Sequence, residues 1–206
     1  MSSIITLNPG VNQATIVGEN IEFIAPQGED NIINAHGDCD VTIFGGSEDD
    51  AITSTGPGDA SIFGGDGHDT ITTGLADDII QGGEGDDVIS SGPGADFIFG
   101  GDGRDTIRSG QSGSIFHPEG DIISGGDGED LFEFQQNEFG GAIDQIVDFQ
   151  ADGFHDLIRI MGVTDGDVTY DPDTGLVSIN GEAVIDIGTG LGVDVNEVGD
   201  NTWEIF

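Results

Sequence analysis

The chain has 206 residues, of which 41 are Asp or Glu and three are Lys or Arg, so its formal net charge at pH 7 is −38. Such a charge repels polyanions, which argues against nucleic acid and anionic membrane surfaces as partners. Glycine contributes 37 residues without a collagen period, and the single cysteine, Cys39, excludes an internal disulfide framework and a zinc cluster.

Residues 1–25 contain short apolar pieces separated by the turn-forming sequences NPG and GEN, a pattern that predicts short strands. We expect these strands to cap the first coil of a repeat array, because an end coil otherwise exposes its apolar interior. The segment lacks a basic start and a continuous apolar run, and no stretch of the chain suits a membrane span. Export, if it occurs, is therefore expected without a cleaved N-terminal signal.

Residues 26–134 form an array that repeats every nine or ten residues. Five consecutive units are regular, GGDGHDTIT, TGLADDIIQ, GGEGDDVIS, SGPGADFIF and GGDGRDTIR, with Asp in the sixth place and Ile in the eighth. Two ten-residue units, AHGDCDVTIF and STGPGDASIF, lie upstream, and an insertion near 109–117 interrupts the count before the last two units. The predicted core residues are Ile33, Ile43, Ile52, Ile62, Ile71, Ile80, Ile89, Ile98, Ile107, Ile123 and Phe132.

The period has a simple physical interpretation. The Gly-rich part of each unit makes a turn, and the remaining three residues make a short strand with its middle side chain inward. Two units then form one coil with a strand on each side. The sequence predicts an all-β fold, a right-handed parallel β-roll (β-helix) of about five to six coils and roughly 25 Å length, with a C-terminal β-strand and hairpin cap.

The repeated pattern GGxGxDx(large apolar)x resembles the repeats-in-toxin (RTX) family, whose β-rolls bind calcium between the turns of adjacent coils. The resemblance implies that each ion lies between turns two units apart and binds sixth-place carboxylates and backbone carbonyls, hard oxygen ligands that suit Ca²⁺. It implies roughly six to eight Ca²⁺ ions. The expected metal ligands and turn glycines are Asp40, Asp50, Asp59, Asp69, Asp78, Asp87, Asp96, Asp105, Asp121, Asp130, Gly65, Gly67, Gly83, Gly85, Gly92, Gly94, Gly101, Gly103, Gly126 and Gly128.

Alternate units place these aspartates on two edges of the roll. The edge with the Gly-Gly turns carries Asp50, Asp69, Asp87, Asp105 and Asp130, and the other edge carries Asp40, Asp59, Asp78, Asp96 and Asp121. An isolated Asp in a Gly-rich turn usually makes an Asx-turn, but ten in register favour calcium binding. Asn31 stands at the Asp place of the first unit, which predicts a weak first turn.

One outward flank of the predicted roll is apolar. It carries Phe44, Phe63, Phe97 and Phe99, whereas the opposite flank is mostly small or polar. Apolar rows of this size are expected to be covered. The covering group could be the C-terminal region, the inserted loop, a protein partner or a second copy of the chain, and the sequence leaves these alternatives open.

Residues 135–206 form the expected C-terminal β region. Their DQIVDF and DLIRI segments resemble the strand pair that follows such repeats in secreted serralysin-like proteins, and Asp148 and Asp156 could hold a further ion or belong to a loop. Pro–Gly and Asn180-Gly181 turns predict hairpins. Glu204-Ile205-Phe206 is similar to the end of an uncleaved type I secretion signal.

Catalytic patterns are missing from the sequence. It contains neither HExxH nor GxSxG, its four histidines are scattered through turns, and Cys39 has no basic neighbour to activate it. We therefore expect a non-catalytic calcium-binding protein, secreted or attached to a cell surface, that folds when its Asp columns bind Ca²⁺. The alternative is a calcium-dependent polysaccharide-binding or enzyme-accessory module, and a hydrolase is the least favoured.

Overall fold

A computed structural model of the chain describes residues 3–6, 13–16, 20–38, 40–110, 119–135, 142–150, 156–164, 168–199 and 201–206. Within these ranges every regular element is a β-strand. The described part of the chain holds no helix of the length and apolar character needed to cross a membrane. The predicted all-β fold class is thus confirmed.

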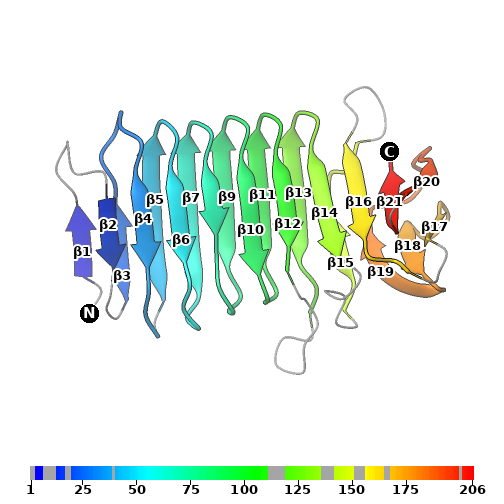
Figure 1. Cartoon of the computed structure of the whole chain (residues 1–206), viewed down its shortest axis with the longest axis horizontal. Coiled ribbons are helices and arrows are strands. Elements are labelled where there is room, and N and C mark those ends of the chain that lie inside the picture. Colours follow the sequence, from blue (N-terminus) through cyan, green and yellow to red (C-terminus); the bar gives the residue numbers. More distant parts are fainter. Residues whose placement is uncertain are drawn as a thin grey trace.

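The strands form two sheets that face each other along the molecule (Figure 1). Sheet A has 11 strands in the order β1 (Ser3–Thr6), β3 (Ile21–Ile24), β5 (Val41–Ser47), β7 (Ala60–Asp66), β9 (Ile79–Glu84), β11 (Phe97–Asp102), β13 (Ile122–Asp127), β15 (Asp144–Ile146), β19 (Glu182–Asp186), β18 (Leu176–Ile179) and β17 (Val168–Asp171). Sheet B has 10 strands in the order β2 (Gln13–Ile16), β4 (Ile32–Ala35), β6 (Ala51–Ser54), β8 (Thr70–Thr72), β10 (Val88–Gly92), β12 (Thr106–Ser109), β14 (Leu131–Gln135), β16 (Leu157–Met161), β21 (Thr202–Ile205) and β20 (Val195–Gly199).

Successive strands alternate between the two sheets, so the chain winds as a parallel β-solenoid. Parallel pairing runs without a break from β1 to β15 in sheet A and from β2 to β16 in sheet B. Each coil adds one strand to each sheet, as the stacked arrows of Figure 1 show. The repeat array makes about six turns of this solenoid, in agreement with the predicted parallel roll.

The predicted core is confirmed residue by residue. Each predicted Ile, and Phe132, is at most 1% exposed and points between the sheets. The stack is longer than expected, because Phe23 of β3 pairs in register with Ile43 and is fully buried. Ile146 and Ile158 continue it at the other end. The N-terminal strands that the sequence suggested as a cap therefore join the two sheets as further strands of the ladder.

The C-terminal region closes the solenoid with antiparallel strands. β21 pairs antiparallel with β16, while β17, β18 and β19 form the predicted hairpins at the end of sheet A. Asn180 and Gly181 have φ values of 55° and 84°, as a type I′ turn requires. These strands extend the sheets and do not lie over the outward flank of sheet A, where Phe97 and Phe99 remain 47% and 44% exposed. Residues 111–117 of the predicted insertion lie outside the described ranges.

Glycine is needed in the turns because successive coils approach each other closely. Gly83 has a φ of +131°, and a Cβ built on it would lie 1.9 Å from the carbonyl oxygen of Gly65 in the preceding coil. A residue with a Cβ adopts this positive φ only with strain, and its Cβ does not fit into the space between the coils. The Gly content therefore follows from the coil spacing.

Candidate metal sites

The turns with Gly-Gly pairs align their aspartates in a column at one edge, which we call column one. In each step, the backbone N–H of one residue donates to the Oδ1 of the Asp in the following coil. The N–H···Oδ1 distances are 2.7 Å for Asn31 to Asp50, 2.7 Å for Asp50 to Asp69, 2.7 Å for Asp69 to Asp87, 2.8 Å for Asp87 to Asp105, 2.9 Å for Asp105 to Asp130 and 3.1 Å for Asp130 to Asp156.

The opposite edge carries a second column, column two, built by the same rule. Its N–H···Oδ1 distances are 2.7 Å for Ala60 to Asp78, 2.9 Å for Asp78 to Asp96, 2.9 Å for Asp96 to Asp121 and 3.0 Å for Asp121 to Asp144. The step from Asp96 to Asp121 crosses the predicted insertion, yet its geometry matches that of its neighbours. The insertion therefore leaves the column intact.

The second oxygen of most of these carboxylates has no hydrogen-bond donor. The Oδ2 atoms of Asp50, Asp69, Asp78, Asp87, Asp96, Asp105, Asp121 and Asp130 are buried and accept no hydrogen bond from the described residues. On the Gly-Gly edge this oxygen packs against the first glycine of the pair, so that a Cβ on Gly82 would lie 2.1 Å from the Oδ2 of Asp87. A buried carboxylate oxygen without a partner is costly, and repeating it eight times points to a missing positive ligand.

Burial also opposes ionisation of these groups. Desolvation is the main cause that raises the pKa of Asp96 to about 8, and the neighbouring charge of Asp121 adds to it. Burial likewise raises the pKa of Asp69, Asp105 and Asp121 to about 7. The same cause raises the pKa of Asp78, Asp87 and Asp130 to about 6. The metal-free columns therefore favour protons or cations at their open oxygens.

The donor set fits a hard cation. Each open atom is a carboxylate oxygen, and backbone carbonyls of the turns supply oxygen as well, which suits Ca²⁺. No group of three or more His, Cys, Asp or Glu side chains that could hold a metal is gathered within the described ranges. An ion between neighbouring turns would consequently need backbone carbonyls in addition to carboxylates.

Asp40 and Asp59 lie outside column two, contrary to the expected register. Both are exposed, and the buried places in register with Asp78 and its successors are held by Val41 and Ala60. The reason is the extra residue of the ten-residue units. It falls between the Asp and the core Ile, so that alternation along the strand turns the Asp away from the column.

Two further aspartates extend the columns beyond the repeats. Asp144 begins β15 and Asp156 precedes β16; they are 1% and 3% exposed and accept the backbone N–H groups of Asp121 and Asp130. Asp156 also accepts the N–H of Gln150. The spacing Asp–x–Ile, which they share with the regular units, is the signal that could have placed both in the columns.

The remaining expected residues have distinct positions. Asp148 accepts hydrogen bonds from the Ser124 hydroxyl and the backbone N–H groups of Gly125 and Gly126, so it anchors a turn. Asn31 begins column one, and its side-chain amide donates to Asp50 Oδ1 at 2.8 Å. The expected turn glycines lie between the strands or at strand ends, and all except Gly94 have a positive φ.

The raised pKa values predict a pH dependence for the metal-free fold. Folded-state pKa values of about 6 to 8 lie above the ordinary Asp value of 3.8, so this contribution to stability is complete below 3.8 and is lost as the pH rises through 6 to 8. Metal-free protein should therefore keep more of its β-sheet circular dichroism signal at pH 5 than at pH 8. A pH titration in chelator, followed by circular dichroism, measures the effect. A metal-free β-sheet signal that grows as the pH rises would contradict it.

Comparison with known proteins bears on the central turns. Residues 54–89 and residues 72–107 match the family described as RTX calcium-binding nonapeptide repeat (4 copies). No curated protein and no solved structure matches the chain. The matched residues run from β6 to β12 and include the middle members of both columns.

Proposed function

Because this chain is a parallel β-solenoid that carries RTX calcium-binding nonapeptide repeats, we propose that it is a non-catalytic calcium-binding protein of the cell exterior, whose solenoid folds as Ca²⁺ fills its two columns. One observation carries the proposal: eight buried aspartates recur in register along the two columns, and the Oδ2 of each accepts no hydrogen bond from the described residues. Bound Ca²⁺ would supply the positive charge that these oxygens lack.

The column members are the proposed ligands. Column one would bind ions through Asp50, Asp69, Asp87, Asp105 and Asp130, and column two through Asp78, Asp96 and Asp121, with carbonyls of the adjacent turns. We assign residues 26–134 to the calcium-binding roll and residues 1–25 and 135–206 to its two ends. Asp144 and Asp156 support a continuation of both columns into the C-terminal end.

An exterior location is supported by the physics of the columns. Calcium sites of extracellular modules typically work at about 10⁻⁴ to 10⁻³ M Ca²⁺, a range reached outside cells. A chain with a net charge of −38 resists compaction where free calcium is scarce. The same chain can therefore stay open inside a cell and fold outside it.

A non-catalytic role is supported by the similar environments of the column carboxylates. Acid–base chemistry needs titratable groups in unlike environments, whereas the column aspartates repeat one environment from coil to coil. His68, which stands in a turn, accepts the backbone N–H of Asp86 through Nδ1 at 2.7 Å. Its role is the same as that of the fifth-place Asp86, whose Oδ1 accepts the N–H of Arg104.

A pair of double variants tests the ligand assignment. Asp78→Asn with Asp96→Asn removes two column charges, whereas Asp40→Asn with Asp59→Asn removes two charges from the same edge outside the column. We expect the first variant to bind at least one ion fewer per chain, and the second to match the unaltered protein. Equilibrium dialysis with metal analysis counts the ions, and terbium luminescence reports the sites independently.

The control makes the test decisive. Both variants change the net charge equally, so loss of bulk electrostatic attraction would lower calcium binding in both. Equal ion counts in the two variants would contradict the assignment of column two. An unaltered protein that binds no calcium at millimolar concentration would overturn the proposed function.

A further inference from the structure

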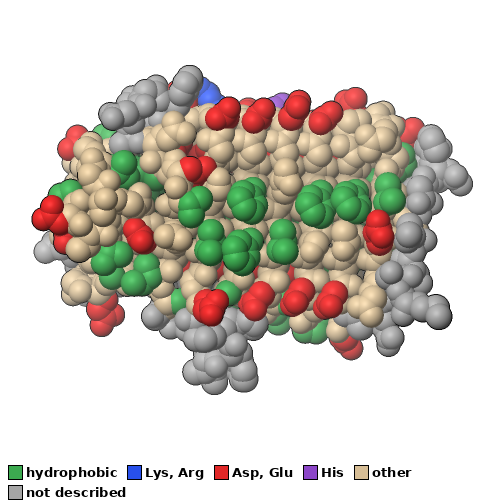
Figure 2. All heavy atoms as spheres, turned by 180° about the vertical axis from the view of Figure 1, so that it is seen from behind, with side chains coloured by type: hydrophobic (Ala, Val, Ile, Leu, Met, Phe, Trp, Pro, Cys, Tyr) green, Lys and Arg blue, Asp and Glu red, His purple; other side chains and the backbone are tan. Residues whose placement is uncertain are grey.

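The outward side of sheet A carries a face that no described residue covers. We call it the phenylalanine face, and it consists of the outward residues of β5, β7, β9, β11 and β13. Phe97, Phe99 and Ile79 are 44 to 47% exposed, while Phe44 and Phe63 stack with ring centroids 5.0 Å apart. Figure 2 shows hydrophobic side chains along the middle of this face with a row of acidic side chains on each side.

The acidic rows come from two positions of the repeat. Asp66, Glu84, Asp102 and Asp127 end their strands in register and are all exposed. On the other side, Asp40, Asp59 and Asp77 precede their strands and are exposed too. Both rows border the apolar stripe at β7 and β9, and beyond these strands the first row continues to β13 and the second to β5.

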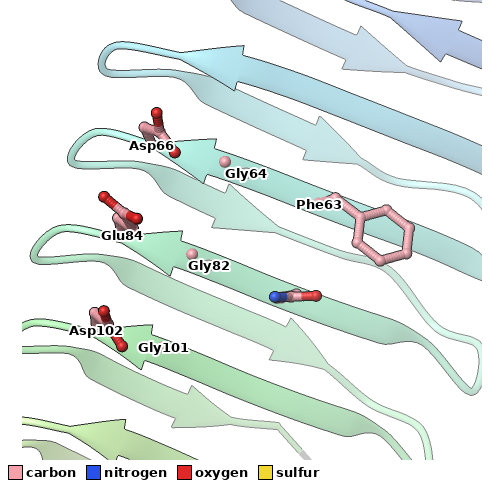
Figure 3. Close-up of a pocket in the computed structure, with 10 residues that line it drawn as sticks. Phe63, Gly64, Asp66, Gly82, Glu84, Gly101 and Asp102 are labelled. Carbon is pink, nitrogen blue, oxygen red and sulfur yellow. The ribbon is translucent and has the colours of Figure 1, made fainter.

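A hollow lies between the apolar stripe and the first acidic row. It has a volume of about 410 Å³, with Phe63 and Gln81 on one side and Asp66, Glu84 and Asp102 on the other. The Gly-Gly pairs form its floor because they add no side chain, as Figure 3 shows for the strand ends that carry these carboxylates. The hollow can thus accept a long side chain that lies over glycine and ends at a carboxylate.

The chain itself provides no described cation for this face. Its three arginines lie elsewhere, Arg108 and Arg159 on sheet B and Arg104 in a turn, and they pair with Glu129, Glu133 and Glu204. A second copy of the chain is a poor partner, since face-to-face packing would bring acidic rows against acidic rows.

From this arrangement we propose that the phenylalanine face binds a basic amphipathic helix of a partner protein, which lies along the solenoid axis. The apolar stripe of the helix packs on the phenylalanines, and Lys or Arg side chains at its borders reach the two acidic rows. The proposal goes beyond calcium binding and does not depend on which residues hold the ions.

The width and length of the phenylalanine face suit a helix of this kind. The acidic rows stand about seven residues apart along a strand, or roughly 23 Å, while a helix with its side chains is about 10 to 12 Å wide. The remaining gap on each side suits an extended Lys or Arg side chain, whose stem covers apolar surface while its charge reaches outward. Strands β5 to β13 span roughly 19 Å along the axis, the length of a helix of about 13 residues.

A labelled peptide tests the proposal. The probe is a synthetic leucine–lysine peptide of about 14 residues with its leucines on one helical face. Fluorescence anisotropy in millimolar calcium measures its dissociation constant, and a peptide of the same composition in scrambled order shows how much binding is due to charge alone. We expect the ordered peptide to bind at least about tenfold more tightly than the scrambled one.

Matched variants locate the binding. Phe97→Ser with Phe99→Ser should weaken binding at least about tenfold, whereas Val88→Ser, which alters an equally exposed residue of sheet B, should leave it unchanged. Glu84→Gln with Asp102→Asn should weaken it several-fold, and the equally charged control Asp173→Asn with Glu197→Gln should not. The charge variants keep the test valid if the serine variant fails to fold, which circular dichroism would reveal.

Other outcomes overturn the proposal. Equal binding of ordered and scrambled peptides, or equal effects of face and control variants, would show that only the net charge attracts the probe. Light scattering that reveals a dimer lost in the Phe97→Ser and Phe99→Ser variant would assign the face to a second copy of the chain instead.

Discussion

In excess chelator at neutral pH, the chain should lose most of its β-sheet circular dichroism signal, and added Ca²⁺ should restore it. Removing the ions leaves eight buried carboxylate oxygens without partners, in a chain with a net charge of −38. At a tenfold excess over its dissociation constant each ion contributes about 1.4 kcal/mol, so six ions would contribute roughly 8 kcal/mol. That amount equals the whole net stability of a typical domain.

Two controls separate specific binding from charge screening. NaCl at matched ionic strength lowers repulsion among exposed carboxylates but does not fill the columns, so it should restore little of the signal. Mg²⁺ holds its water tightly and prefers strict octahedral geometry, and it should be a weak substitute. A β-sheet signal that survives chelation unchanged would contradict calcium-dependent folding.

The Gly83→Ala variant should be strongly destabilised, by at least about 4 kcal/mol. Its Cβ would lie 1.9 Å from the carbonyl oxygen of Gly65, so the two coils could no longer stack at their present spacing. The φ of +131° adds backbone strain, because residues with a Cβ avoid that region. Urea unfolding at one fixed calcium concentration measures the loss.

Gly181→Ala provides the matched control. Gly181 also has a positive φ, +84°, but nothing lies within 4 Å of the position that a Cβ would take there. Its substitution should cost only about 1 to 2 kcal/mol from the left-handed conformation. If the two variants lost equal stability, close stacking of the coils would not be the reason for glycine at position 83.

The fold could be predicted because the repeat links two independent signals. The eighth-place Ile fixes each inward position, and the Gly-rich turn fixes where the chain crosses to the other sheet. At the N-terminal end this pairing of signals fails, since Phe23 takes a core place without a Gly-rich unit around it. The sequence therefore predicts a cap at this end, where the strands in fact continue the stack.

The structure aligns the expected carboxylates in columns where the Asp–x–Ile spacing holds. Asp40 and Asp59 stand three residues before Ile43 and Ile62, so strand alternation turns them outward, although their Gly-rich turns resemble the others. Asp144 and Asp156 keep the two-residue spacing and are buried, but no Gly-rich unit marks them. Register with the core, and not turn composition, therefore decides which carboxylates enter a column.

The alternation of strands between two sheets also limits how genes for such chains can lengthen or shorten. In the regular coils, hydrogen-bonded turns are 18 residues apart. Duplicating a whole coil adds one strand to each sheet and leaves every later side chain on its original face. Duplicating a single nonapeptide would send Phe97, Phe99 and every later strand to the opposite sheet. Viable length variants of this chain should therefore differ by pairs of repeats.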